Sequence, residues 1–64
     1  MHTIRYKGLV AQQNNYNYHV AIYKDGDMVM HSQQSKKLSC RELRGMINHY
    51  LALVKAMKGG GADG

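Results

Sequence analysis

The sequence has few of the residues and segments that reveal compartment or chemistry. Its 64 residues include one cysteine, Cys40, and four acidic residues. A single cysteine excludes an intramolecular disulfide and a zinc site built from several cysteines, and it suits a reducing compartment. We find no apolar run of 18 residues and no apolar N-terminal segment of the signal-peptide type. We therefore expect a cytoplasmic protein of a bacterial or phage-infected cell, with no membrane contact.

Catalytic signatures are also missing. The acidic residues Asp25 and Asp27 fall in a predicted turn, Glu42 has a predicted capping role, and Asp63 is near the C-terminus, so no carboxylate pair remains for acid–base chemistry. Cys40 has no assigned base or oxyanion site, both of which a nucleophile needs. The run of three glycines follows a helix, which is the wrong place for a phosphate-binding loop. We expect neither an enzyme nor a cofactor.

Positive charge is what the chain has in excess. Nine lysines and arginines give a formal net charge of +5 and a pI near 9.6. Such a balance favours nucleic acid, nucleotides or an acidic protein surface as partners, although solubility alone also accounts for a basic small domain. A domain of this size buries only about 60% of the surface of its unfolded chain, so a partner or a second copy would stabilise it.

The clearest predicted element is a helix over residues 40–58. Ser39 is a typical N-cap, because its hydroxyl can accept a hydrogen bond from a free N–H of the first turn. Glu42 lies three residues later and completes a capping box. Leu38 and Leu43 flank the cap at the positions of a hydrophobic staple. Local sequence therefore marks the start of this helix.

The apolar stripe and the end of this helix are also visible. Apolar residues recur at three- and four-residue steps and predict one buried stripe, made of Leu43, Met46, Ile47, Tyr50, Val54 and Met57. Gly59 is expected to end the helix. We predict a single domain over 1–58, followed by a flexible glycine-rich tail over 59–64.

Upstream of the helix the apolar period changes to two. Residues 2–11 alternate and are interrupted at Gly8, where a bulge or bend is expected. Residues 16–24 and 27–33 alternate on either side of a tight turn. The predicted fold class is α+β, a three-stranded antiparallel sheet with one C-terminal helix packed on one face, in the order β-β-β-α.

The turn at Asp25 and Gly26 decides which side chains share a face. A two-residue loop pairs Lys24 with Asp27 and leaves each face half apolar. A three-residue loop pairs Tyr23 with Asp27 and gathers one apolar face, made of Tyr18, Val20, Ile22, Met28 and Met30. Because burial of one face strongly specifies register, we choose the three-residue loop.

This register sets His19 opposite His31 on the face away from the helix. The predicted core consists of Ile4, Tyr6, Tyr18, Val20, Ile22, Met28, Met30, Leu38, Leu43, Met46, Ile47, Tyr50, Val54 and Met57. The predicted open face consists of Thr3, Arg5, Lys7, Asn17, His19, Tyr23, His31 and Gln33.

The open face and the segment before the helix are the candidate binding site. Cations, an aromatic ring, amides and imidazoles suit phosphate contact and base stacking. Residues 32–37 approach free N–H groups at the helix start, which favours phosphate binding there. The candidate residues are Arg5, Lys7, His19, Tyr23, His31, Gln33, Lys36, Lys37, Arg41 and Arg44. The alternatives are a polar outer sheet face of the ordinary kind and a solvated loop.

A metal site is not expected. His19 and His31 could share an ion as a cross-strand pair, but metal sites usually need three or four converging ligands. His49 falls on the polar side of the predicted helix and His2 lies at the N-terminus. The sequence supplies no third ligand.

The order strand–strand–strand–helix over about residues 16–54, with "SKK" ahead of the helix, resembles a truncated double-stranded-RNA-binding domain. That family carries much of its RNA contact on an N-terminal helix, which this chain lacks, and its lysine pair lies inside the helix start. The topology is also similar to the arm-binding domains of some integrases, which lay a three-stranded sheet on DNA, and to antitoxin domains of the partial double-stranded-RNA-binding type. These resemblances are at the level of the fold.

Three hypotheses follow from the sequence. The first is a small basic accessory protein, encoded by a phage or mobile element, that binds nucleic acid or a nucleoprotein complex through the open sheet face. The second is a protein-interaction module that inhibits a host protein complex. The third is a structural homodimer that pairs edge strands or open faces.

Overall fold

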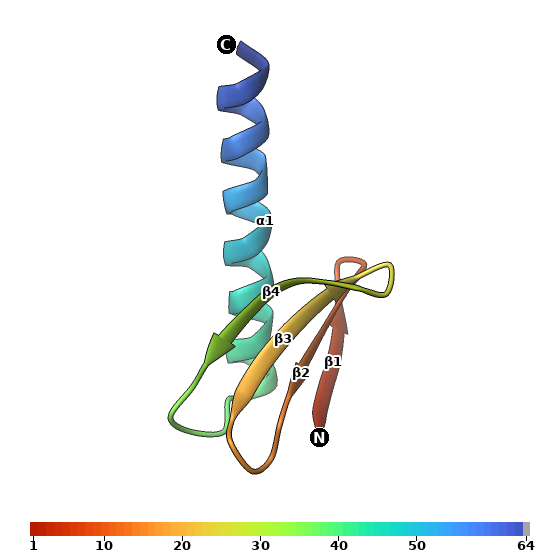
Figure 1. Ribbon diagram of the computed structural model, residues 1–64, viewed down its shortest axis with the longest axis vertical. Coiled ribbons are helices and arrows are strands. Elements are labelled where there is room, and N and C mark those ends of the chain that lie inside the picture. Colours follow the sequence, from red (N-terminus) through yellow and green to blue (C-terminus); the bar gives the residue numbers. More distant parts are fainter. Residues whose placement is uncertain (64) are drawn as a thin grey trace.

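Four β-strands are followed by one α-helix. The computed structural model describes residues 1–63, with side chains through residue 57. The elements are β1 (His2–Tyr6), β2 (Leu9–Gln13), β3 (His19–Lys24), β4 (Asp27–Gln33) and α1 (Cys40–Asp63). The strands form one antiparallel sheet in the order β1-β2-β3-β4, and α1 crosses one face of it (Figure 1). The predicted α+β class is confirmed, whereas the predicted number of strands, three, is wrong.

The additional strand arises at Gly8, where the sequence predicts only a bend. Tyr6 pairs with Leu9, so Lys7 and Gly8 form a two-residue turn. Both have positive φ, 52° and 80°, which matches the type I′ hairpin turn. A lysine rarely adopts this conformation. Here its amine donates to Asn48 Oδ1 at 2.9 Å, so a contact with α1 holds the turn from outside the hairpin.

The second turn is built around Asn14. Its side-chain oxygen accepts hydrogen bonds from the backbone N–H groups of Tyr16 and Asn17, at 2.7 and 3.2 Å. Its backbone pairs with His19 and Tyr18. Tyr18 has a positive φ of 61°, so it belongs to the turn rather than to β3. The prediction of a strand beginning at residue 16 is wrong for this reason.

The third turn corrects the predicted register. Lys24 pairs with Asp27, and the two residues between them have positive φ, so the loop has two residues and not three. The pairing then shifts between Ile22 and Tyr23, because β4 carries one extra residue, Val29, between Met28 and Met30. This β-bulge brings Met30 opposite Ile22. The sheet thus combines the short turn with an apolar face, which the sequence analysis treated as alternatives.

The face of the sheet under α1, called the inner face, holds the core. Seven hydrophobic side chains from the sheet, from α1 and from the segment before α1 are buried there, namely Leu9, Ala11, Val20, Ile22, Leu38, Leu43 and Ile47. Ile4, Tyr6, Met30, Met46 and Tyr50 are partly buried against them. The prediction of Val20, Ile22, Leu38, Leu43 and Ile47 as core is confirmed, and β2 supplies the part that was missed.

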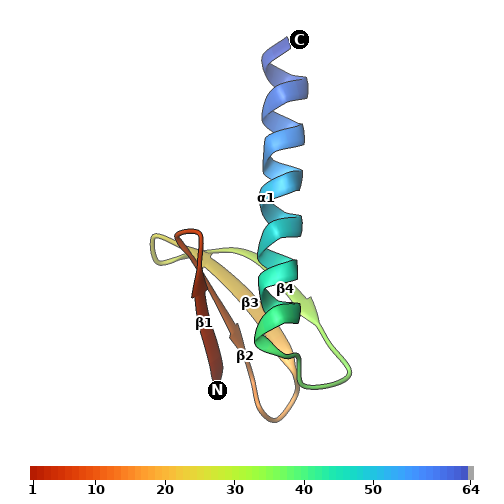
Figure 2. The same cartoon turned by 180° about the vertical axis from the view of Figure 1, so that it is seen from behind.

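Two predicted core methionines are on the surface. Met28 is 53% exposed because the two-residue turn sets it opposite Tyr23, on the face of the sheet away from α1. Met57 is 75% exposed because α1 runs beyond the sheet (Figure 2). Tyr18 and Val54 are half-buried. The predicted core is therefore wrong where α1 extends beyond the sheet and where the turn before β4 is shorter than predicted.

Helix α1 begins as predicted. Ser39 Oγ accepts from the backbone N–H of Glu42, and Glu42 accepts from that of Ser39, both at 3.1 Å. Helix α1 spans Cys40–Asp63 and so continues beyond Gly59, where the sequence predicts that it ends. The predicted tail, 59–64, falls outside the residues whose side chains are described, and the domain boundary stays a prediction. Over the described residues, no helix has the length and apolarity to cross a membrane.

Candidate nucleic-acid interface

The face of the sheet away from α1, called the outer face, is uncovered. Strand pairing arranges its side chains in rows that cross all four strands. One row runs Arg5, Val10, Tyr23 and Met28, and the next runs Thr3, Gln12, Ala21 and His31. Tyr23 lies on a central strand and is half-buried among these neighbours, so part of its side chain is exposed on the outer face.

Two imidazoles meet beside these rows. His19 pairs with Gln33 and His31 with Ala21, so the predicted pairing of the two histidines is wrong. The two-residue turn and the bulge each shift the register by one residue. They are nevertheless diagonal neighbours on the outer face, with His19 Nε2 and His31 Nδ1 3.2 Å apart and ring centroids at 5.3 Å. One ring donates a hydrogen to the other, so each keeps a second nitrogen for another partner.

Gln33 connects this pair to the neighbouring turn. Its side-chain amide donates to the backbone oxygens of Asn17 and Gln34. Asn17 in turn accepts from the backbone N–H of His19 at 2.9 Å. These hydrogen bonds fix the β2–β3 turn and the end of β4 relative to each other, at one end of the outer face.

The structure divides the ten candidate residues into two groups. Arg5, His19, Tyr23, His31 and Gln33 share the outer face. The other five lie at the β1–β2 turn, in the segment before α1 or on α1, namely Lys7, Lys36, Lys37, Arg41 and Arg44. Among the six candidates predicted for the open face, only Lys7 lies off the outer face, and the remaining four candidates belong to the predicted corner at the helix start.

Lys7 belongs to a cluster between the β1–β2 turn and α1. Its amine donates to Asn48 and lies 5.2 Å from the centroid of the Tyr6 ring. The pKa of the Tyr6 hydroxyl is lowered from 10.0, chiefly by a hydrogen bond from Asn48 and also by the charges of Lys7 and Arg44. This cluster orders the first turn against the helix and adds positive charge on the side of α1 nearest β1.

The segment before α1 carries negative charge as well as positive. Lys36 Nζ lies 3.7 Å from a Glu42 carboxylate oxygen, and both side chains are largely exposed. The Ser39 backbone N–H donates to Glu42, which is the main reason that the pKa of Glu42 lies below 4.5. A carboxylate thus lies where the sequence favours phosphate binding.

Cys40 has a neighbour that the sequence did not reveal. Its sulfur lies 3.6 Å from Nε2 of His2, because β1 runs beside the start of α1. The sequence places His2 only near the N-terminus, and no local signal links two positions 38 apart in sequence. Among the described residues, no group of three or more potential ligands is placed to hold a metal ion.

Comparison with known proteins gives no match to a family model, a curated protein or a solved structure.

Proposed function

We propose that the protein binds single-stranded nucleic acid on its outer sheet face, without catalysing a reaction. The observation that carries this proposal is the row that joins Tyr23 on a central strand to Arg5 at the sheet edge, next to the His19–His31 pair. An aromatic ring on an open sheet can stack on a base, and unstacked bases are available only in single strands.

The roles of the outer-face residues follow from their chemistry. Tyr23 provides the stacking ring, and Arg5 reaches a phosphate one or two nucleotides away along the same row. The free ring nitrogens of His19 and His31 can donate to or accept from base edges. The net charge of +5 supplies long-range attraction to the polyanion. Each phosphate contact should add about 0.7 to the slope of log affinity against log salt for single strands.

Fluorescence anisotropy with labelled 12-nucleotide DNA and RNA strands, and with a duplex of the same sequence, tests the proposal. We expect single strands to bind more tightly than the duplex, and Tyr23→Ser to weaken binding about 5- to 100-fold, since base–aromatic stacking contributes about 1–3 kcal/mol. The matched control is Tyr16→Ser, because Tyr16 is 93% exposed in a turn and lies off the sheet.

A second pair of variants separates phosphate contact from general charge. Arg5→Gln and Lys55→Gln remove the same charge, but Lys55 lies on α1. We expect only Arg5→Gln to lower the salt slope, by about 0.7. Absence of binding at 25 mM salt, or equal losses for Tyr16→Ser and Tyr23→Ser, would refute the proposal; circular dichroism checks that each variant is folded.

A further inference from the structure

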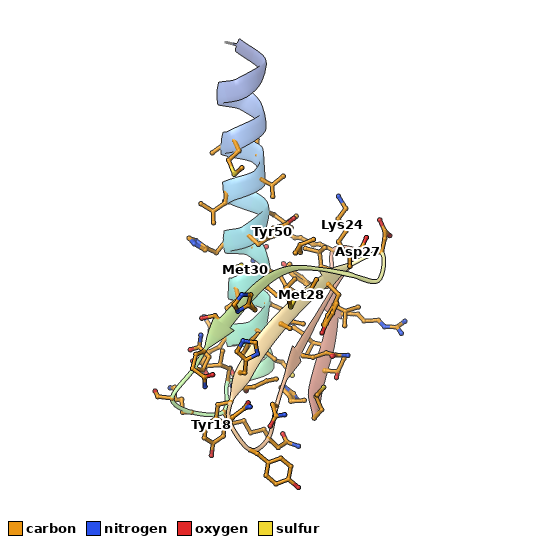
Figure 3. All side chains as sticks on the ribbon, viewed as in Figure 1. Tyr18, Lys24, Asp27, Met28, Met30 and Tyr50 are labelled. Carbon is orange, nitrogen blue, oxygen red and sulfur yellow. The ribbon has the colours of Figure 1, made fainter. Side chains whose placement is uncertain are left out.

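Helix α1 presents an apolar side that the sheet covers only in part, at Met46 and Tyr50. Met46, Tyr50, Leu53 and Met57 recur at steps of four, three and four residues, which places them on one side of the helix. Leu53 is 46% exposed and Met57 is 75% exposed. Tyr50 lies where α1 leaves the sheet (Figure 3). We call these four residues the apolar helix face.

A groove continues this face toward the sheet. It lies between β4 and α1, has a volume of about 500 Å³ and is lined by Met30, Leu38 and Met46 together with polar residues. It exists because α1 packs mainly on β1 and β2 and covers the inner side of β4 only in part. The apolar helix face and the groove share Met46, so the apolar part of the groove adjoins this face.

The lysine and arginine residues of α1 up to residue 57 lie on the opposite side, whereas Glu42 and His49 line the groove. Arg41, Arg44, Asn48 and Lys55 follow one another at steps of three, four and seven residues and so share a side. The hydrogen bond from Lys7 to Asn48 shows that this side is turned toward β1. A molecule that approaches the apolar helix face therefore does not meet this basic stripe, and a second copy of a chain with net charge +5 can approach there without strong local repulsion.

We propose that the apolar helix face is the interface of a homodimer in which two α1 helices pack antiparallel. The steps of four, three and four read the same in both directions, so a twofold axis pairs Met46 with the partner's Met57 and Tyr50 with the partner's Leu53. Such a contact is isologous, as in most dimers. The uncovered end of each helix then reaches the groove of the other copy, at Met30 and Leu38.

The interface is restricted to one helix face and one groove, which places it at the small end of specific interfaces, about 1,200 Å² in total. We therefore expect a dissociation constant in the micromolar range, about 1–100 μM. The inner side of both copies takes part, so the outer face remains free. The proposal does not rest on nucleic-acid binding.

Sedimentation equilibrium of the full chain from 5 μM to 1 mM, without nucleic acid, tests the dimer. Leu53→Lys introduces a charge into the apolar helix face, and we expect it to weaken dimerisation at least about a hundredfold, because each dimer loses two buried leucines. Ala52→Lys is the matched control, since the neighbouring residue carries the same new charge on a different side of α1. We expect it to leave dimerisation within about threefold of the unchanged chain.

A second experiment tests where the interface lies. Isotope-filtered nuclear Overhauser measurements on a mixture of labelled and unlabelled chains should show contacts between the methyl groups of Met57 and Met30 across the dimer. A monomer at 1 mM overturns the proposal, whether or not another protein binds this surface. A dimer that Leu53→Lys and Ala52→Lys weaken equally, or one without contacts between Met57 and Met30, also overturns it. Circular dichroism confirms folding, and Met57→Lys serves as the second variant if Leu53→Lys does not fold.

Discussion

The side-chain oxygen of Gln13 accepts a hydrogen bond of 2.7 Å from the backbone N–H of Leu38, just before α1 begins. The amide of Gln13 also donates to the backbone oxygens of Tyr18, at 3.1 Å, and Lys36, at 2.9 Å. Gln13 is only 1% exposed. One buried glutamine on β2 thus fixes both the β2–β3 turn and the segment that delivers the chain to the helix.

Replacement of Gln13 by Ala should lower the free energy of unfolding by about 3 kcal/mol, because buried backbone groups lose their partners at about 1–3 kcal/mol each. Urea denaturation followed by circular dichroism measures this. Gln12→Ala is the control, since Gln12 is half-exposed on the outer face, and it should change stability by no more than about 0.5 kcal/mol. Equal effects of the two substitutions would show that the Gln13 bonds do not hold the fold together.

The contribution of Glu42 to stability should depend on pH. Its pKa in the folded protein lies below 4.5 because the Ser39 N–H and the charge of Lys36 favour the carboxylate. A lowered pKa stabilises the fold above the unfolded value, and this contribution is lost as pH falls through the folded value. We expect Glu42→Gln to be less stable than the unchanged chain at pH 7, and this difference to shrink as pH falls below 4.5 toward pH 3.

Ser39→Ala provides the comparison for this pH effect. It removes the hydroxyl that caps the backbone N–H of Glu42, at a cost of about 1 kcal/mol. The hydroxyl does not titrate in this range, so most of the loss should persist at pH 3. If the stability gap of Glu42→Gln were the same at pH 7 and pH 3, charge would have no part in the cap.

Gly45 should be replaceable by Ala with a gain in stability. It lies within α1, and a Cβ atom built on it meets no atom within 4 Å. Glycine in a helix interior costs about 1 kcal/mol relative to alanine, so Gly45→Ala should raise the free energy of unfolding by about that amount. Thermal and urea unfolding at low protein concentration would measure it. A loss of stability would mean that the bare backbone at Gly45 has a role in contacts.

Deletion of Val29 should preserve the pairing of β3 with β4. The two-residue turn already sets Met28 opposite Tyr23, and without the bulged residue the next pair is still Ile22 with Met30. We expect a folded protein that has lost no more than about 1.5 kcal/mol, the contribution of one partly buried valine. Cross-strand nuclear Overhauser contacts between Ile22 and Met30 would confirm the register. Their replacement by contacts between Ile22 and Met28 would contradict it.

The sequence predicts best what local interactions determine. The start of α1 follows from Ser39 and Glu42, whose bonds lie within one helical turn. The first hairpin was missed because its turn residue, Lys7, is held by Asn48 from 41 positions away. The β-bulge at Val29 has no local sequence signal. It allows the two-residue turn at Asp25 and Gly26 and also places Met30 on the inner face, opposite Ile22.

The candidate site shows the same division. Alternation along the strands places Arg5, Tyr23 and His31 correctly on the face away from α1. Lys7 was placed with them because a single strand was assumed through Gly8. The contact of Cys40 with His2 and the groove beside β4 depend on how α1 crosses the sheet, and no pattern in one sequence records that crossing.

The order of strands in the sheet is the order of strands in the chain. Each hairpin can therefore form from its own turn before the other strands pair, and the loops that must close are short. The chain has no proline, so refolding should lack the slow phase of tens of seconds that prolyl isomerisation produces. We expect a fast, single-exponential refolding transition on the time scale of mixed α/β two-state domains.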